Sequence, residues 1–334
     1  MKLDNSLIEK NTGISLIRLL MSFVVVLTHF GTAAPTVFTP FGEAAVPSFI
    51  FVSFFLLSDS LDVLEPGRLR KRFRRLLYPL LFWSLAYYIL FSAAGGTLID
   101  YRQLIFSMLL GSSRVLNPTL WYLGAVVYIT GFVVLCCLIF PEGRGRTLFF
   151  VLLLLFCFVF QYSGMNYYLF SSQVYETSFL FGRLLEALPH ALAGLLFGKY
   201  GKGLRLSRLL ALMAALGLGA FLLRFLPAAE GFGYQGMPLF CWASFICVAL
   251  ISLPHIKSRA LAGAVNYLAQ YTLGVFCIHY AVGIVLQSLS LRTGFSFWQG
   301  SLIFDLIIWG LSLAASILMG LLSKKLRFLR YAVM

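Results

Sequence analysis

Residues 14–31 read ISLIRLLMSFVVVLTHFG, and this stretch decides the class of fold. The run is long and apolar enough for a transmembrane helix, which needs about 20 such residues. It nevertheless contains Arg18 near its start and His29 near its end. An ionisable side chain inside a hydrophobic span is costly unless it has a partner or a function. The stretch therefore predicts a membrane helix in which Arg18 and His29 each have either a polar partner or a function.

The composition extends this prediction to the whole chain. Its 334 residues are 60% hydrophobic and 11% charged, with a mean hydropathy of +0.90. Soluble domains are nearer to about half apolar and about a quarter charged. We therefore expect an all-α, polytopic protein of the cytoplasmic membrane. The first apolar run is too long for a signal peptide and lacks a small-residue cleavage site, so it is expected to be a retained span.

Charged and Gly/Pro-rich breaks divide the chain into about ten candidate spans. No soluble segment and no internal repeat interrupts them, so we predict a single transmembrane domain over residues 1–334. The predicted spans are 14–34, 46–64, 76–93, 118–140, 147–163, 183–200, 207–226, 237–255, 266–289 and 299–322.

The basic residues test this topology. The net charge of +14 can suggest nucleic acid, but most of the 26 Lys and Arg residues fall in alternate loops. This alternation follows the positive-inside rule and predicts that both termini are cytoplasmic. It also argues against a nucleic-acid partner and for the lipid bilayer as the surroundings. The loop GRLRKRFRR at 67–75 carries more positive charge than orientation requires.

Arg18 and His29 are predicted to share one face of their helix. Eleven residues turn a helix by ~1100°, about 20° more than three full turns, and rise ~16 Å. An interfacial anchor for Arg18 and an interhelical hydrogen bond for His29 are the simpler interpretations. Together the pair suits a ligand with an anionic end at the cytoplasmic surface and a reactive end deep in the membrane. Acyl-CoA has this shape.

Other ionisable residues are predicted at a similar depth. Counting from the span ends places His190, His279, Asp305 and Glu186 near the level of His29. Buried ionisable groups tend to face a cavity and one another, so we expect a polar chamber in the outer half of the membrane. There a neutral imidazole can take a proton from an alcohol if a carboxylate orients it. The sequence leaves open whether that carboxylate is Asp305 or Glu186.

The cysteines predict no metal site. All six lie in or at the ends of apolar runs, without the spacing of metal ligands or of a disulfide framework. They are Cys136, Cys137, Cys157, Cys241, Cys247 and Cys277.

Five segments, in order along most of the chain, resemble the membrane-bound acyltransferase-3 family. Arg18 and His29 are similar to that family's Arg-x10-His on the first span. The chain differs from the family pattern at two positions, with Ser15 where many members have Asp and Phe54 where they have Gly. The other matching segments are VPSFIFVSFFLL at 46–57, KRFRRLLYP at 71–79, LWYLGAVVY at 120–128 and YTLGVFCIHY at 271–280.

The resemblance implies an enzyme that acylates cell-envelope glycans or similar extracytoplasmic acceptors, including lipid-linked sugars. His29 would be the catalytic histidine. Arg18, Arg72 and Arg75 would bind the acyl-CoA donor, for which acetyl-CoA is the expected form. The oligomeric state is not predicted.

Four further residues complete the predicted site. Trp121 and Tyr122 are predicted to form an aromatic platform for the acceptor, although an interfacial aromatic belt is the alternative. His190 and His279 are predicted to contact the substrate.

Two other functions stay open at this point. A proton-coupled transporter would use the layer of His, Asp and Glu residues to move its substrate, without a coenzyme. A catalytically silent member would only bind or sense a ligand.

Overall fold

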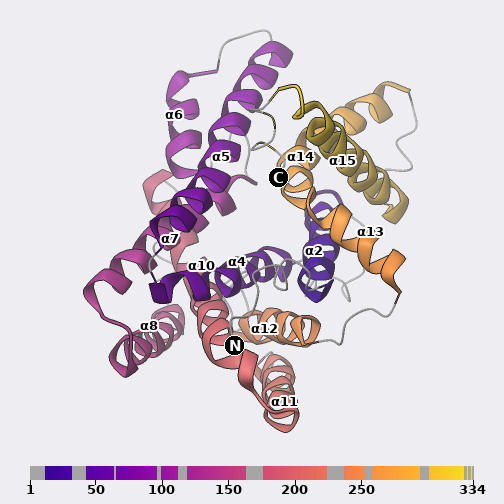
Figure 1. Cartoon of the computed structure of the whole chain (residues 1–334). Coiled ribbons are helices and arrows are strands. Elements are labelled where there is room, and N and C mark those ends of the chain that lie inside the picture. The colour runs from indigo at the N-terminus through magenta and orange to yellow at the C-terminus, as the bar shows by residue number, and fades with distance from the viewer. Residues whose placement is uncertain are drawn as a thin grey trace. The chain divides into compact units, whose positions relative to one another are not determined.

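The computed structural model describes residues 12–31, 43–63, 65–95, 99–111, 119–162, 176–223, 237–252, 258–293 and 301–326, together with residues 329 and 332. Within these residues the chain forms α-helices and a short 3₁₀ turn, and no strand (Figure 1). The helices are α2 (Thr12–Phe30), α4 (Ala45–Val63), α5 (Pro66–Gly95), α6 (Tyr101–Leu110), α7 (Trp121–Ile139), α8 (Arg144–Tyr162), α10 (Glu176–Tyr200), α11 (Leu206–Leu223), α12 (Met237–Ile251), α13 (Arg259–Ala269), α14 (Thr272–Thr293) and α15 (Leu302–Leu322), and the turn is η1 (Gly201–Gly203).

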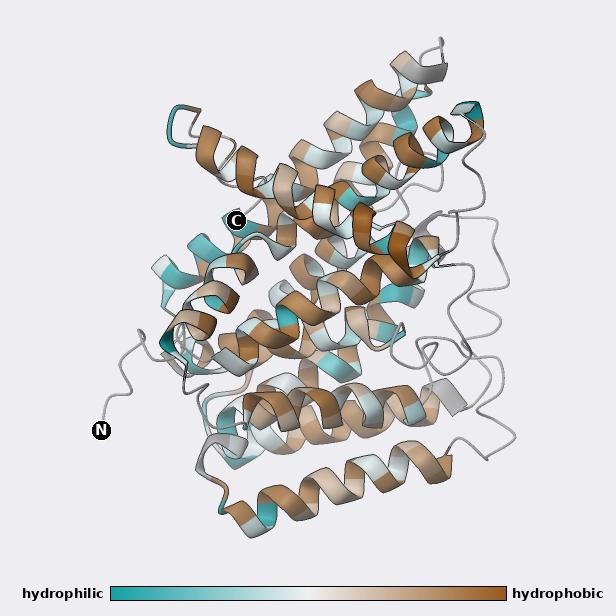
Figure 2. Cartoon of the chain, turned by 90° about the vertical axis from the view of Figure 1, so that its right-hand side faces the viewer, coloured by the Kyte–Doolittle hydropathy of each residue, from teal (hydrophilic) through white to brown (hydrophobic). Residues whose placement is uncertain are grey.

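The predicted all-α membrane fold is confirmed, and a helix coincides with each of the ten predicted segments. Hydrophobic residues predominate along the helices (Figure 2). Six helices in the described part of the chain are long and apolar enough to cross a bilayer, namely α2, α5, α7, α11, α14 and α15. The protein is therefore a multi-pass membrane protein. The count of ten crossings stays a prediction, as do the cytoplasmic termini, because residues 1–11, 333 and 334 lie outside the described residues.

Helix α6 was not among the predicted segments. Its ends carry ordinary stop signals, because the Asp100 side chain accepts a hydrogen bond from the Arg102 amide and Gly111 closes the helix with a φ of 76°. At ten residues it is too short to cross a membrane.

The ninth predicted span begins inside a separate helix. The helical pattern breaks after α13, where the amide of Tyr271 donates to the Leu268 carbonyl at 3.0 Å. Helix α14 then starts at Thr272, whose hydroxyl donates to the Ala269 carbonyl. The apolar sequence hides this break because no Gly or Pro marks it.

The chain divides into two compact units. Unit 1 comprises residues 1–45, 77–120 and 250–334, and unit 2 comprises residues 46–76 and 121–249. The division falls within α5. One domain over the whole chain stays a prediction.

In unit 1, α2 packs against α13, α14 and α15, and α14 packs against α15. Phe30, at the end of α2, lies so close to α14 that a methyl group on Gly283 would be 2.1 Å from its Cζ. The indole of Trp309 on α15 donates to the Ser22 hydroxyl on α2 at 3.0 Å. These contacts hold the last turns of α2 in place.

In unit 2, α10 packs against α7 and α8. It also approaches α4 closely, because a methyl group on Gly194 would lie 2.2 Å from the carbonyl oxygen of Phe51. Only glycine permits this separation of the two backbones.

Candidate functional site

His29 lies in the last turn of α2 with its side chain exposed. Its ring centroid is 5.3 Å from that of His279 on α14. Tyr280, the next residue of α14, meets the His29 ring edge to face at 6.4 Å. The exposed imidazole of His29 thus packs against the imidazole of His279 and the phenol ring of Tyr280.

His279 is fully buried, with 0% of its surface exposed. Its Nδ1 lies 3.1 Å from the Val275 carbonyl oxygen and 2.8 Å from the Phe276 carbonyl oxygen. Because carbonyl oxygens only accept, Nδ1 must carry the hydrogen. The neutral ring then presents Nε2 as an acceptor, and this buried nitrogen has no hydrogen-bond partner among the described residues.

Asp305 occupies the first turn of α15, where a negative charge suits the helix dipole. The helix starts there because the Ser301 hydroxyl accepts from the amide of Phe304 at 3.2 Å. Asp305 is 1% exposed, and its Oδ1 has no partner among the described residues. A methyl group on Gly31 would lie 3.2 Å from the Asp305 Oδ2. The carboxylate therefore lies beside the chain two residues after His29.

Arg18 is half-buried and lies eleven residues before His29 on the same helix. Helix α2 is continuous between them, so their Cα atoms are separated by ~16 Å along the axis. The predicted role of Arg18 in binding a donor stays a prediction.

Arg72 and Arg75 lie in the basic first turns of α5, within unit 2. Arg72 makes several internal contacts. Its guanidinium donates to the Ser53 carbonyl at 3.0 Å, to the Ser53 hydroxyl at 2.9 Å and to the Thr130 hydroxyl at 3.3 Å. It also lies over the Phe54 ring at 5.1 Å, a cation–π contact at the position where the family pattern has glycine. Arg75, in contrast, is exposed.

Trp121 and Tyr122 begin α7, and both are buried. The Arg183 guanidinium lies 4.8 Å from the Trp121 ring centroid and donates to Glu186 at 2.7 Å. The buried Glu186 carboxylate is thus already paired with a cation one turn earlier in α10. The predicted aromatic platform for the acceptor stays a prediction.

His190 is buried in unit 2, with its ring 5.5 Å from that of Phe240. Of the five ionisable residues predicted to share one layer, three lie in unit 1 and two, Glu186 and His190, in unit 2. The structure brings the rings of His29 and His279 together, and it places Asp305 beside Gly31, two residues after His29. A chamber shared by all five stays a prediction.

A family model described as an acyltransferase domain matches residues 11–321. The chain belongs to the acyltransferase-3 family. It is therefore an acyltransferase of the membrane, as the sequence resemblance predicted. No curated protein and no solved structure matches the chain.

One residue beside the acyltransferase site was missed from the sequence. The hydroxyl of Tyr87, on the part of α5 in unit 1, donates to the Cys277 carbonyl at 2.7 Å and accepts from the Ala281 amide at 3.2 Å. An undistorted α-helix joins these two backbone groups directly. The Tyr87 hydroxyl thus connects the Cys277 carbonyl to the Ala281 amide, on either side of His279. Tyr87 and Cys277 are 190 positions apart, and no local sequence pattern indicates this contact.

Within the described part of this acyltransferase, no group of three or more His, Cys, Asp or Glu side chains is placed to hold a metal ion. The side chains at the site instead suit proton transfer. An exposed imidazole can meet a substrate, a buried imidazole packs against it, and a carboxylate lies beside the backbone two residues further on.

Proposed function

We propose that this acyltransferase moves an acyl group from cytoplasmic acyl-CoA, with acetyl-CoA as the expected donor, to a hydroxyl of an extracytoplasmic acceptor. The acceptor would be a cell-envelope glycan or a lipid-linked sugar, and the enzyme would reside in the cytoplasmic membrane. Membership of the family supports acyl transfer. The basic start of α5 and Arg18 support a donor that carries phosphates.

The observation that carries the proposal is the exposed ring of His29 packed on the buried ring of His279. His29 would take the proton of the acceptor hydroxyl as its oxygen attacks the thioester carbonyl. The tetrahedral intermediate then collapses, the carbon–sulfur bond breaks, and the imidazolium returns the proton to the departing thiolate. Atoms and charge balance without a further reactant.

The second role open to His29 is to carry the acyl group. The imidazole would attack the thioester itself, and the acceptor hydroxyl would then attack the acyl-imidazole. This route requires a labelled protein intermediate, so the two roles are separable by trapping after a single turnover.

Asp305 is the better candidate for the orienting carboxylate. It lies in the same unit as His29, beside Gly31, and its Oδ1 is a buried acceptor that lacks a partner among the described residues. Glu186 already accepts from Arg183. A carboxylate that is engaged by a guanidinium is a poorer acceptor for a second donor.

The test uses purified protein in proteoliposomes with radiolabelled acetyl-CoA outside and candidate glycan acceptors inside. We expect label transfer by the wild type and by Thr28→Ala, which changes an exposed neighbour on α2, but not by His29→Gln. A transporter would instead show proton-dependent uptake without coenzyme. A lack of transfer to every acceptor, together with such uptake, would overturn the proposal.

A further inference from the structure

A small cavity lies in unit 2 where the end of α10 meets the start of α8. Its volume is about 30 Å³, and it is open to solvent. Its lining is mostly apolar, and two cations, Arg146 and Lys199, are among the lining residues. In the predicted topology this end of the helices faces the cytoplasm. The other lining residues are Ser58, Leu61, Cys137, Thr147, Phe150, Leu195, Leu196 and Tyr200.

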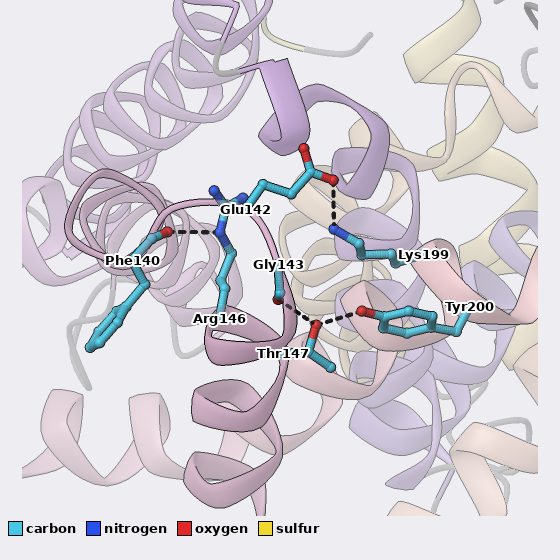
Figure 3. Close-up of polar contacts among 7 residues, drawn as sticks. All are labelled: Phe140, Glu142, Gly143, Arg146, Thr147, Lys199 and Tyr200. Carbon is cyan, nitrogen blue, oxygen red and sulfur yellow. Dashed lines mark hydrogen bonds and ion pairs between the residues drawn. The ribbon is translucent and has the colours of Figure 1, made fainter.

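Arg146 is held in the wall rather than free in solvent. Only 7% of its surface is exposed, and its Nε donates to the Phe140 carbonyl at 2.9 Å (Figure 3). This bond fixes the guanidinium plane at the end of α7. A guanidinium fixed in this way is preorganised for an anion, because it loses little freedom on binding.

Lys199 reaches the cavity from the last turn of α10. Its ammonium lies 3.0 Å from the Glu142 carboxylate, which is about half exposed and does not line the cavity (Figure 3). Glu142 therefore acts as an internal competitor for any anion that Lys199 binds. An exposed ion pair of this kind is weak and exchanges readily.

The hydroxyls of Thr147 and Tyr200 connect two of the helices that line the cavity. The Thr147 hydroxyl donates to the Gly143 carbonyl at 3.2 Å, so the short hydrogen bond between Thr147 and Tyr200 has the Tyr200 hydroxyl as donor (Figure 3). This bond links the start of α8 to the end of α10. The first turn of α8 lies in the same wall, and the positive end of its dipole favours an anion.

We propose that this cavity binds a phosphate group, carried either by the headgroup of an anionic phospholipid or by a soluble phosphate compound. Arg146, Lys199 and Thr147 of the first turn of α8 all line it, and a guanidinium, an ammonium and a helix N-terminus suit a multiply charged oxyanion. The mostly apolar lining suits the glycerol end of a lipid. The cavity lies in unit 2, whereas His29 and His279 lie in unit 1. The proposed phosphate binding does not depend on the proposed acyl transfer.

The experiment uses full-length protein in nanodiscs. One arm measures retention of phosphatidylglycerol from a mixture with phosphatidylcholine by native mass spectrometry, and the other measures binding of radiolabelled inorganic phosphate. Lys199→Gln should weaken binding at least about tenfold, because it removes a charge-assisted hydrogen bond. Glu142→Gln should strengthen binding, because it removes the competitor. Arg144→Gln, an exposed cation outside the cavity, is the matched control and should change neither.

The two arms identify the source of the phosphate. Selective retention of phosphatidylglycerol that responds to Lys199→Gln and Glu142→Gln in opposite directions assigns a lipid headgroup. The same opposite responses with inorganic phosphate alone assign a soluble compound. Equal binding by the wild type and all three variants, in both arms, would overturn the proposal. If Lys199→Gln folds poorly, Glu142→Gln still tests the proposal, because unchanged binding by that variant would contradict it.

Discussion

The ring of His279 lies 5.3 Å from the ring of His29, and its Nδ1 is committed to two backbone carbonyl oxygens of its own helix. These two bonds fix the tautomer of the buried His279 ring, which lies next to the exposed ring of His29. This arrangement gives the two histidines different tasks. His29 can meet a substrate, whereas His279 can act only through a group that reaches its Nε2.

Replacing His279 separates these tasks. An asparagine can keep the donor that Nδ1 supplies to Val275 and Phe276 but cannot replace Nε2. We expect His279→Asn to lower kcat by about 100-fold, at the lower end of the range of acid–base contributions. Its Tm should stay within a few degrees of the wild type. Normal turnover by a folded His279→Asn would show that Nε2 has no part in the reaction.

Asp305 and Glu186 are distinguished by a pair of amide variants. Asp305→Asn keeps the size of the side chain and removes its charge, so kcat should fall at least about tenfold with little change in the donor KM. Glu186→Gln should mainly cost stability, about 1–3 kcal/mol, because it breaks the buried pair with Arg183. If Glu186→Gln instead loses kcat while Asp305→Asn does not, the orienting role belongs to Glu186.

Substitutions at two glycines test whether the packing of Phe30 against Gly283 positions His29. In Gly283→Ala the new methyl group would lie 2.1 Å from Phe30 Cζ, so the Phe30 ring at the end of α2 must move. We expect a loss of about 1–3 kcal/mol in stability, with a lower kcat. Gly310→Ala on α15 is the control, because nothing lies within 4 Å and alanine favours a helix by about 1 kcal/mol. Thermal unfolding and turnover of both variants provide the check.

Arg72 and Arg75 are predicted to bind the same donor but differ in their surroundings. Arg75 is exposed, so Arg75→Ala should raise the donor KM without changing Tm. Arg72→Ala should raise the donor KM and also lower Tm, because it removes hydrogen bonds to Ser53 and a cation–π contact with Phe54. A fall in kcat at unchanged KM in Arg75→Ala would contradict donor binding by this loop.

The sequence was a good guide to what depends on local periodicity. Hydropathy located a helix in every predicted span, and 100° per residue placed Arg18 and His29 on one face of α2. The pairing of Glu186 with Arg183 was also accessible from the sequence, because residues three apart in a helix are neighbours.

Relations between distant helices were not accessible in this way. Counting depth predicted that His29, His279 and Asp305 lie at one level, but depth does not say which helices touch. His29 contacts His279 next to the place where Phe30 packs against Gly283, and the Tyr87 bridge joins residues 190 positions apart. Such contacts follow from packing in three dimensions rather than from any local pattern.

The most direct test of the central claim is the turnover of radiolabelled acetyl-CoA by His29→Gln in proteoliposomes, with coenzyme binding measured on the same preparation. We expect the variant to bind coenzyme with an affinity within about threefold of the wild type but to transfer label at least about 100-fold more slowly. Transfer at the wild-type rate by a variant that lacks this imidazole would show that His29 takes no part in the chemical step.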